Sequence, residues 1–163
     1  MSQMVHDAGS PEIGDLATPI NSSGFSRALI KNLPAYRAGL SPQRRGLEVG
    51  MAHGYFLYGP FMVLGPLRLT EHAGTAGLLA TLGLISILTI CLSLYGYAGS
   101  APSVQPAGVT VANPPANLFT REGWSEFTSG FLIGACGGAF FAFLLCSTSF
   151  VKQLMVSLPA SGV

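Results

Sequence analysis

The chain has 163 residues, of which 49% are hydrophobic and only 9% are charged, and its formal net charge is +1. Soluble globular domains usually carry about 25% charged residues, so the composition argues against that class. The near balance of charges gives no indication of a nucleic-acid partner, which would call for a basic patch. Three long tracts, 49–67, 72–120 and 127–151, contain no charged residue. The sequence therefore predicts an all-α integral membrane protein.

Residues 1–45 form a polar N-terminal arm. Turn and breaker signals recur in it ("GSP", "TPI", "NSSG", "LSP"), and a short helix is predicted from Gly24 to Leu33, ended by Pro34. The first residues lack the positive flank and apolar core of a signal peptide. Membrane insertion is therefore expected to depend on the internal helices.

Three transmembrane helices are predicted in the domain 46–150, at about 46–67, 73–98 and 124–150. Each tract reaches the roughly 20 residues that a helix needs to cross a bilayer core. The segment 99–123 is rich in Pro, Gly, Ser and Asn, which predicts a loop outside the membrane without helix. Residues 151–163 form a short C-terminal tail.

The basic residues near the spans predict the orientation of the chain. The second half of the arm carries five of them, Arg27, Lys31, Arg37, Arg44 and Arg45, whereas each later segment outside the membrane carries one. Because Lys and Arg accumulate on the cytoplasmic side, we expect the N-terminus there. With three spans, the C-terminus lies on the opposite side.

Glycines repeat at four-residue spacing in two of the spans. Gly46, Gly50 and Gly54 form one ridge, and a second ridge is formed by Gly130, Gly134 and Gly138. Such ridges let two helices approach closely in a membrane. They equally leave room for a flat ligand against the backbone, and both interpretations can hold along different lengths of one helix.

Glu48 and His53 are ionisable residues in the first predicted span, where such groups are costly unless something compensates them. Glu48 lies within one turn of Arg44 and Arg45, so an ion pair within the helix is one interpretation. His53 lies about 140° around the helix from Glu48, which makes pairing between them poor. For His53, a hydrogen bond to a neighbouring helix and metal ligation through a neutral ring nitrogen both stay open.

The possible metals differ in the ligands they need. Zinc requires three or four convergent ligands, and a haem held by two histidines requires both at the same depth, whereas His6 lies in the arm and His72 beyond the first span. A magnesium porphyrin takes a single axial ligand, which can be nitrogen or oxygen. Glu48 and His53 could thus each hold one chlorophyll. No catalytic motif occurs, so no enzymatic activity is expected.

The stretch "NLPAYRAGLSPQRRGLEVGMAHGYFLYGPF", followed by "LGPLR", resembles subunit XI of the photosystem I reaction centre, the PsaL family. "GDLATPI" upstream and "REGWSEFTSGFLIGA" downstream also match the pattern of that family. The resemblance extends from about Gly14 to Phe143. It implies a non-catalytic accessory subunit with three membrane helices, a stromal arm and a lumenal C-terminus in the thylakoid membrane.

The resemblance also implies cofactors and partners. Members bind chlorophyll and carotenoid, and the matching residues Glu48 and His53 become axial ligands of chlorophyll magnesium. The aromatic residues around the site, Tyr55, Phe56, Tyr58 and Phe61, are expected to contact pigment rings, with ordinary helix packing as the alternative. The expected partners are the photosystem I core subunits, on which the basic arm would dock, neighbouring small membrane subunits, membrane lipids and further copies of this chain, because members form the centre of a trimer.

One position departs from the family pattern. Cyanobacterial members commonly place an aspartate directly after LGPLR, where it helps to hold a calcium ion between protomers, but this chain has Leu69 there. Calcium prefers several hard oxygen ligands, and leucine offers none. Glu71 is the remaining candidate calcium ligand.

Two other function classes compete with this interpretation. A small channel or transporter should line a path with polar groups at several depths, but the second and third spans offer only Ser and Thr. The main alternative is a membrane anchor subunit of a haem or quinone respiratory complex. A Soret band that shifts on reduction would support it.

Overall fold

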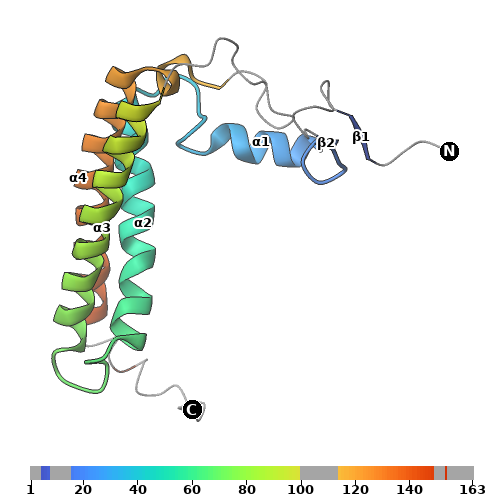
Figure 1. The fold of residues 1–163 in the computed structure, drawn as a ribbon. Coiled ribbons are helices and arrows are strands. Elements are labelled where there is room, and N and C mark those ends of the chain that lie inside the picture. Colours follow the sequence, from blue (N-terminus) through green and yellow to red (C-terminus); the bar gives the residue numbers. More distant parts are fainter. Residues whose placement is uncertain (1–4, 8–15, 100–113, 149–152, 154–163) are drawn as a thin grey trace.

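A computed structural model of the chain describes residues 5–7, 16–99, 114–148 and 153. Figure 1 shows three long helices side by side, with the N-terminal arm projecting from one end of this bundle. The elements are β1 (His6–Asp7), β2 (Leu16–Ala17), α1 (Gly24–Asn32), α2 (Pro42–Leu64), α3 (Ala73–Ala98), the 3₁₀ helix η2 (Ala116–Phe119) and α4 (Arg121–Ser147). The predicted helical fold class is thus observed, with one small addition. Strands β1 and β2 form a two-stranded antiparallel sheet in the arm.

Helices α2, α3 and α4 alternate in direction and form the bundle. The N-terminal end of α2, the C-terminal end of α3 and the N-terminal end of α4 lie at the end that carries the arm (Figure 1). The buried core lies between α3 and α4, where Ile85 packs with Phe127, Phe131 and small residues of α4. These small residues, Ala135 and Ala139, are fully buried. They bring the helices close together because they add little side-chain volume.

Helix ends are set by capping residues that the span predictions did not use. Ser41 accepts a hydrogen bond from the Arg44 amide at 3.3 Å, and Pro42 occupies the first turn, where proline is favoured. The helix therefore starts at Pro42, before the predicted span at 46. Thr120 caps α4 in the same way, with 3.0 Å from its hydroxyl oxygen to the Gly123 amide. Helix therefore occupies Arg121 to Gly123, and η2 also lies inside the segment predicted as loop.

Among the described residues, α3 and α4 are the helices long and apolar enough to cross a membrane by composition. α2 is not among them, and the prediction of three transmembrane helices is therefore confirmed only in part. The physical reason lies in the residues of α2: its first turns carry Arg44, Arg45 and Glu48, and His53 and Pro60 interrupt the remainder. These groups lower the mean hydropathy of a helix that nevertheless lies alongside the other two (Figure 1).

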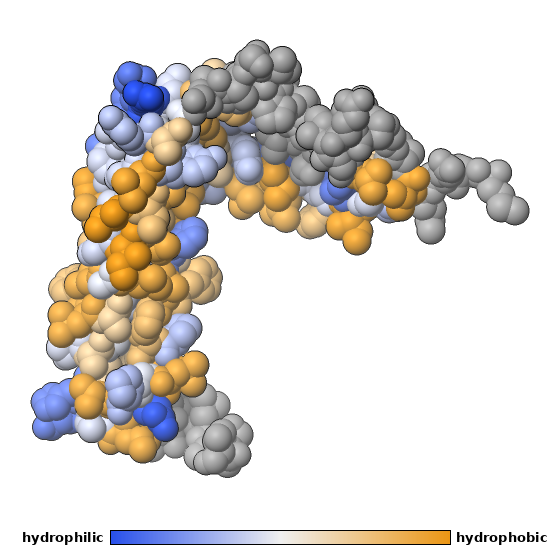
Figure 2. All heavy atoms as spheres, in the orientation of Figure 1, coloured by the Kyte–Doolittle hydropathy of each residue, from blue (hydrophilic) through white to orange (hydrophobic). Residues whose placement is uncertain are grey.

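The surface of the bundle is strongly apolar. Figure 2 shows hydrophobic side chains along much of its visible face, with hydrophilic groups gathered at its two ends. Large side chains that are more than half exposed occur on both α3 and α4, including Leu79, Ile87, Leu94, Ile133 and Phe141. A soluble protein rarely exposes a continuous apolar surface of this extent. The pattern is that of helices surrounded by lipid or by other membrane proteins.

The arm contains α1, which lies crosswise to the bundle (Figure 1). Ser23 caps it, with 3.1 Å from its hydroxyl oxygen to the Ser26 amide, and the helix ends at Asn32, just before Leu33 and Pro34. This confirms the short helix predicted in the arm. Residues 100–113 of the predicted loop, 149–150 of the third predicted span and most of the predicted tail lie outside the described residues.

Candidate functional site

The glycine ridges join α2 to α4. A Cβ atom built on Gly46, Gly50 or Gly54 would overlap backbone carbonyl oxygens of α4, and the three glycines of α4 face α2 carbonyls in the same way. The contacts are Gly46 with Phe127, Gly50 with Phe131, Gly54 with Ala135, Gly130 with Gln43, Gly134 with Leu47 and Gly138 with Met51. The packing interpretation is therefore confirmed at all six positions. At these positions the two backbones are too close for a side chain larger than hydrogen to lie between them.

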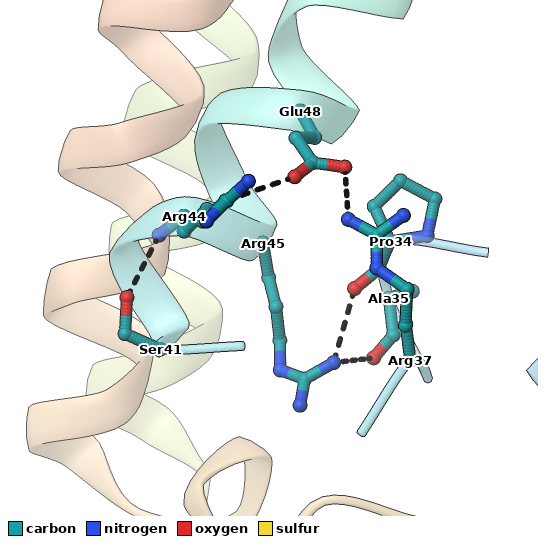
Figure 3. Close-up of polar contacts among 7 residues, drawn as sticks. All are labelled: Pro34, Ala35, Arg37, Ser41, Arg44, Arg45 and Glu48. Carbon is teal, nitrogen blue, oxygen red and sulfur yellow. Dashed lines mark hydrogen bonds and ion pairs between the residues drawn. The ribbon is translucent and has the colours of Figure 1, made fainter. Parts of the chain in front are cut away.

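Glu48 lies near the start of α2 between two arginines (Figure 3). Its Oε1 accepts from Arg44 Nε at 3.2 Å, which is the pairing within the helix that was predicted. Its Oε2 accepts from Arg37 Nη2 at 2.5 Å. Arg37 was missed, because an ion pair across eleven residues depends on how the arm folds back and leaves no periodic signal. The two guanidinium groups together offset the charge of the carboxylate.

Arg45 does not pair with Glu48. Only 3% of its surface is exposed, and its Nη1 donates to the carbonyl oxygens of Pro34 at 3.0 Å and Ala35 at 3.2 Å (Figure 3). A buried charge is tolerated only when hydrogen bonds compensate it. Arg45 and the Arg37–Glu48 pair thus fasten the end of the arm to α2 at two points. We refer to these contacts of Arg37, Arg45 and Glu48 as the arm clamp.

We expect Arg45→Met to loosen the arm, because two carbonyl groups lose their donor, at a cost of about 1.5 kcal/mol and hence about tenfold in the population of the open arm. Trypsin can cut after Arg37 only when the Arg37 side chain leaves Glu48, so the rate of that cut in detergent solution measures the opening. Arg44→Met is the matched control, since the Arg44 side chain is 68% exposed and exposed ion pairs contribute little. Equal cleavage rates for the two variants would contradict this role of Arg45.

His53 lies further along α2, and the structure resolves which of its nitrogens is engaged. Its Nδ1 is 2.8 Å from the carbonyl oxygen of Val49, one turn earlier in the same helix. A carbonyl only accepts, so Nδ1 carries the hydrogen, and in a neutral ring the lone pair is then on Nε2. Within the described residues, the hydrogen bond of the ring goes to α2 itself and not to a neighbouring helix. This arrangement, with Nδ1–H held by a carbonyl, is the one in which imidazoles ligate metals.

The surroundings of His53 leave its ring accessible. The residue is exposed, and the ring packs edge-on against Phe131 of α4, with 5.7 Å between the centroids. Within the described ranges no group of three or more His, Cys, Asp or Glu side chains could hold a metal ion. A metal at His53 would therefore have at most one further ligand of these types from the described residues. Zinc needs three or four protein ligands and does not fit, whereas a magnesium porphyrin needs a single axial ligand and does fit.

Tyr55 and Phe56 follow His53 along α2 and are both exposed, Phe56 to 72%. Their rings pack against each other, with 5.5 Å between centroids, and Tyr55 also lies 6.2 Å from the ring of Phe141. The structure does not bring either ring against that of His53. Tyr55 instead lines an apolar groove of 570 Å³ between α2 and α4, together with Leu47, Met51, Ala52, Ile133, Gly134, Gly137, Gly138 and Phe141.

Glu71 lies in the connection between α2 and α3, at the end of the bundle away from the arm (Figure 1). Its side chain is 87% exposed and lies 3.6 Å from Nε2 of His72. It belongs to no cluster of metal-binding side chains in the described part of the chain. The structure therefore adds no second ligand to the predicted calcium site.

Comparisons with known proteins give a consistent result. The sequence model of the family described as photosystem I reaction centre subunit XI matches residues 3–151. The chain is 66% identical over 152 residues to the photosystem I reaction center subunit XI of Synechococcus elongatus, covering 93% of this chain and 92% of the relative. It is 56% identical over 151 residues to the protein of the same name from Prochlorococcus marinus, covering 93% of this chain and 76% of the relative.

Proposed function

The chain belongs to the photosystem I reaction centre subunit XI family, and from this premise we propose that it is a non-catalytic accessory subunit that binds chlorophyll and joins reaction centres into oligomers. Its place is photosynthesis, in a complex that contains chlorophyll. The observation that carries the proposal is the free Nε2 of His53. A neutral imidazole with its other nitrogen held by Val49 is suited to be an axial ligand of magnesium.

His53 and Glu48 are the proposed axial ligands of two chlorophylls. When bound, chlorophyll absorbs light and passes on excitation energy, and the chain positions the pigment. Each carboxylate oxygen of Glu48 has two lone-pair sites, so hydrogen bonds from Arg37 and Arg44 leave a lone pair for magnesium. The same arginines keep Glu48 ionised near the membrane boundary. Tyr55 and Phe56 offer exposed rings for contact with pigments.

Carotenoid is the second proposed cofactor. The groove between α2 and α4 has an almost wholly apolar lining, and Tyr55 and Phe141 are at its aromatic edge. A long apolar molecule fits such a surface better than a polar one does, because nothing along the groove requires a hydrogen bond. Calcium is a weaker proposal: it would need ligands besides Glu71, from a further copy or from outside the described residues.

We further propose that α2 is the third transmembrane helix, together with α3 and α4. Its 23 residues exceed the length that a bilayer core requires, and Gly46, Gly50 and Gly54 hold its first half against α4. The five basic residues lie at the arm end of the bundle, which supports a stromal N-terminus and a lumenal C-terminus in the thylakoid membrane.

The partners in this proposal are the core subunits and small membrane subunits of photosystem I, lipids and further copies of the chain. The exposed apolar faces of α3 and α4 supply surface for all of them. Part of the arm would dock on the core from the stromal side, through its basic residues.

A density gradient of gently solubilised native membranes tests the proposal, with the chain detected by antibody and chlorophyll by red absorbance. We expect the chain to sediment with chlorophyll at the mass of a photosystem I oligomer. Sedimentation with chlorophyll at monomer mass would remove the oligomer-forming role and point to the changed connection at Leu69. Separation from chlorophyll would contradict the pigment-binding role.

A further inference from the structure

Helix α1 has two chemically different faces. Phe25 and Leu29 are four residues apart and share one face, and they are 77% and 51% exposed. Arg27 and Lys31 are also four residues apart, but at about 100° per residue they lie about 200° around the helix from Phe25 and Leu29, respectively. No residue of α1 is buried within the described chain. An apolar face that covers nothing in its own chain needs an external environment.

The position of α1 relative to the bundle indicates what that environment is. The helix lies crosswise at the arm end of the bundle, where the membrane boundary is expected, and Figure 2 shows hydrophobic surface on the edge of α1 that faces toward the far end of the bundle. The arm clamp supports this angle, because Arg37 and Arg45 fasten the segment that follows α1 to the first turns of α2. The apolar face is thereby presented to the lipid that surrounds α2.

The charges of the arm fit an anionic surface. Between Leu16 and Ser41 the chain contains Arg27, Lys31 and Arg37 and no acidic residue. Short amphipathic helices with basic residues on the polar face lie in the plane of a membrane, with the apolar face at the boundary of headgroups and acyl chains. Basic residues near anionic lipid headgroups strengthen such binding.

We propose that α1 is an in-plane membrane helix, with Phe25 and Leu29 in the interfacial lipid and Arg27 and Lys31 directed to anionic headgroups. The occupant of the apolar face is thus lipid and not a neighbouring subunit. This inference requires that the bundle spans the membrane, but it does not depend on pigment binding. The arm would in this way fix the depth and tilt of α2, which carries Glu48 and His53.

The test measures the depth of single nitroxide labels on the full chain in vesicles of phosphatidylcholine and phosphatidylglycerol. The background carries Cys91→Ala, Cys136→Ala and Cys146→Ala, and labels are attached through Phe25→Cys or Leu29→Cys and, as matched controls on the other face, Arg27→Cys or Lys31→Cys. Oxygen is enriched in lipid and a nickel chelate in water. We expect the ratio of oxygen to chelate accessibility to be several-fold higher on the apolar face.

The outcomes separate the possible occupants. Equal ratios on the two faces in vesicles would overturn the proposal, since α1 would then lie in water. The measurement is repeated in the intact pigment complex. There, a label at Leu29 that both oxygen and chelate fail to reach would also overturn it, because a protein would cover the face. Continued oxygen access in the complex supports lipid. None of these label accessibilities depends on whether His53 binds pigment. The label test and the density-gradient test of the proposed function can therefore fail independently of each other.

Discussion

Gly54→Ala is expected to separate α2 from α4 and to destabilise the bundle by about 3 kcal/mol, the upper end of the usual cost of overpacking. The added methyl would overlap the carbonyl oxygen of Ala135, and backbone atoms of Ala135 and Ala139 surround the same point. A flexible side chain could move aside, but a helix backbone can yield only by shifting the whole helix. Thermal unfolding of the purified chain in detergent measures the loss, as does the amount of chain that stays in native membranes.

Gly83→Ala, in the middle of α3, is the matched control in the same bundle. Nothing lies within 4 Å of a Cβ atom built there, and alanine is a better helix former than glycine by roughly 1 kcal/mol. This variant should therefore be as stable as the native chain or slightly more so. A Gly54→Ala chain that melts at the native temperature would show that α2 and α4 are further apart than described, and it would reopen the ligand interpretation of the glycine ridge.

The glycine spacing was sufficient to predict close packing of the two helices that carry it, because such packing in a membrane has a local signal, whereas the pairing of α2 with α4 comes from the structure. Small residues at every fourth position form a continuous ridge on one face. The limits of the second predicted span also match α3 (Ala73–Ala98), where an uninterrupted apolar tract coincides with the helix. Hydropathy predicted the start of α2 less accurately, because the charged residues of its first turns belong to the same helix as the apolar residues that follow.

The arm clamp could not be predicted from the sequence. Arg37 and Glu48 are eleven residues apart with a turn between them, and the carbonyl partners of Arg45 are backbone atoms of Pro34 and Ala35. Neither contact leaves a periodic pattern or a motif in the sequence, because both depend on the direction in which the arm leaves α2. For Glu48, the sequence indicated Arg44 and Arg45 equally, and the structure selects Arg44.

His53→Leu is expected to remove one chlorophyll per copy of the chain while the helix bundle stays intact. Leucine fits the apolar surroundings, and the bond lost is one from Nδ1 to a carbonyl of the same helix, so the fold should tolerate the change. The chlorophyll content of the isolated complex, measured against the amount of this chain, gives the result. Normalising to the chain separates the loss of a ligand from the loss of the whole subunit.

Two further variants sharpen this test. His72→Leu is the control: its side chain is 71% exposed in the connection beyond α2, and the chlorophyll content should not change. His53→Gln should restore part of the pigment, because its amide oxygen can also donate a lone pair to magnesium. A structural role for the ring against Phe131 predicts the opposite order, with leucine tolerated better than glutamine in apolar surroundings. Unchanged chlorophyll in His53→Leu would show that the free Nε2 is not the ligand, and Glu48 would then be the remaining candidate.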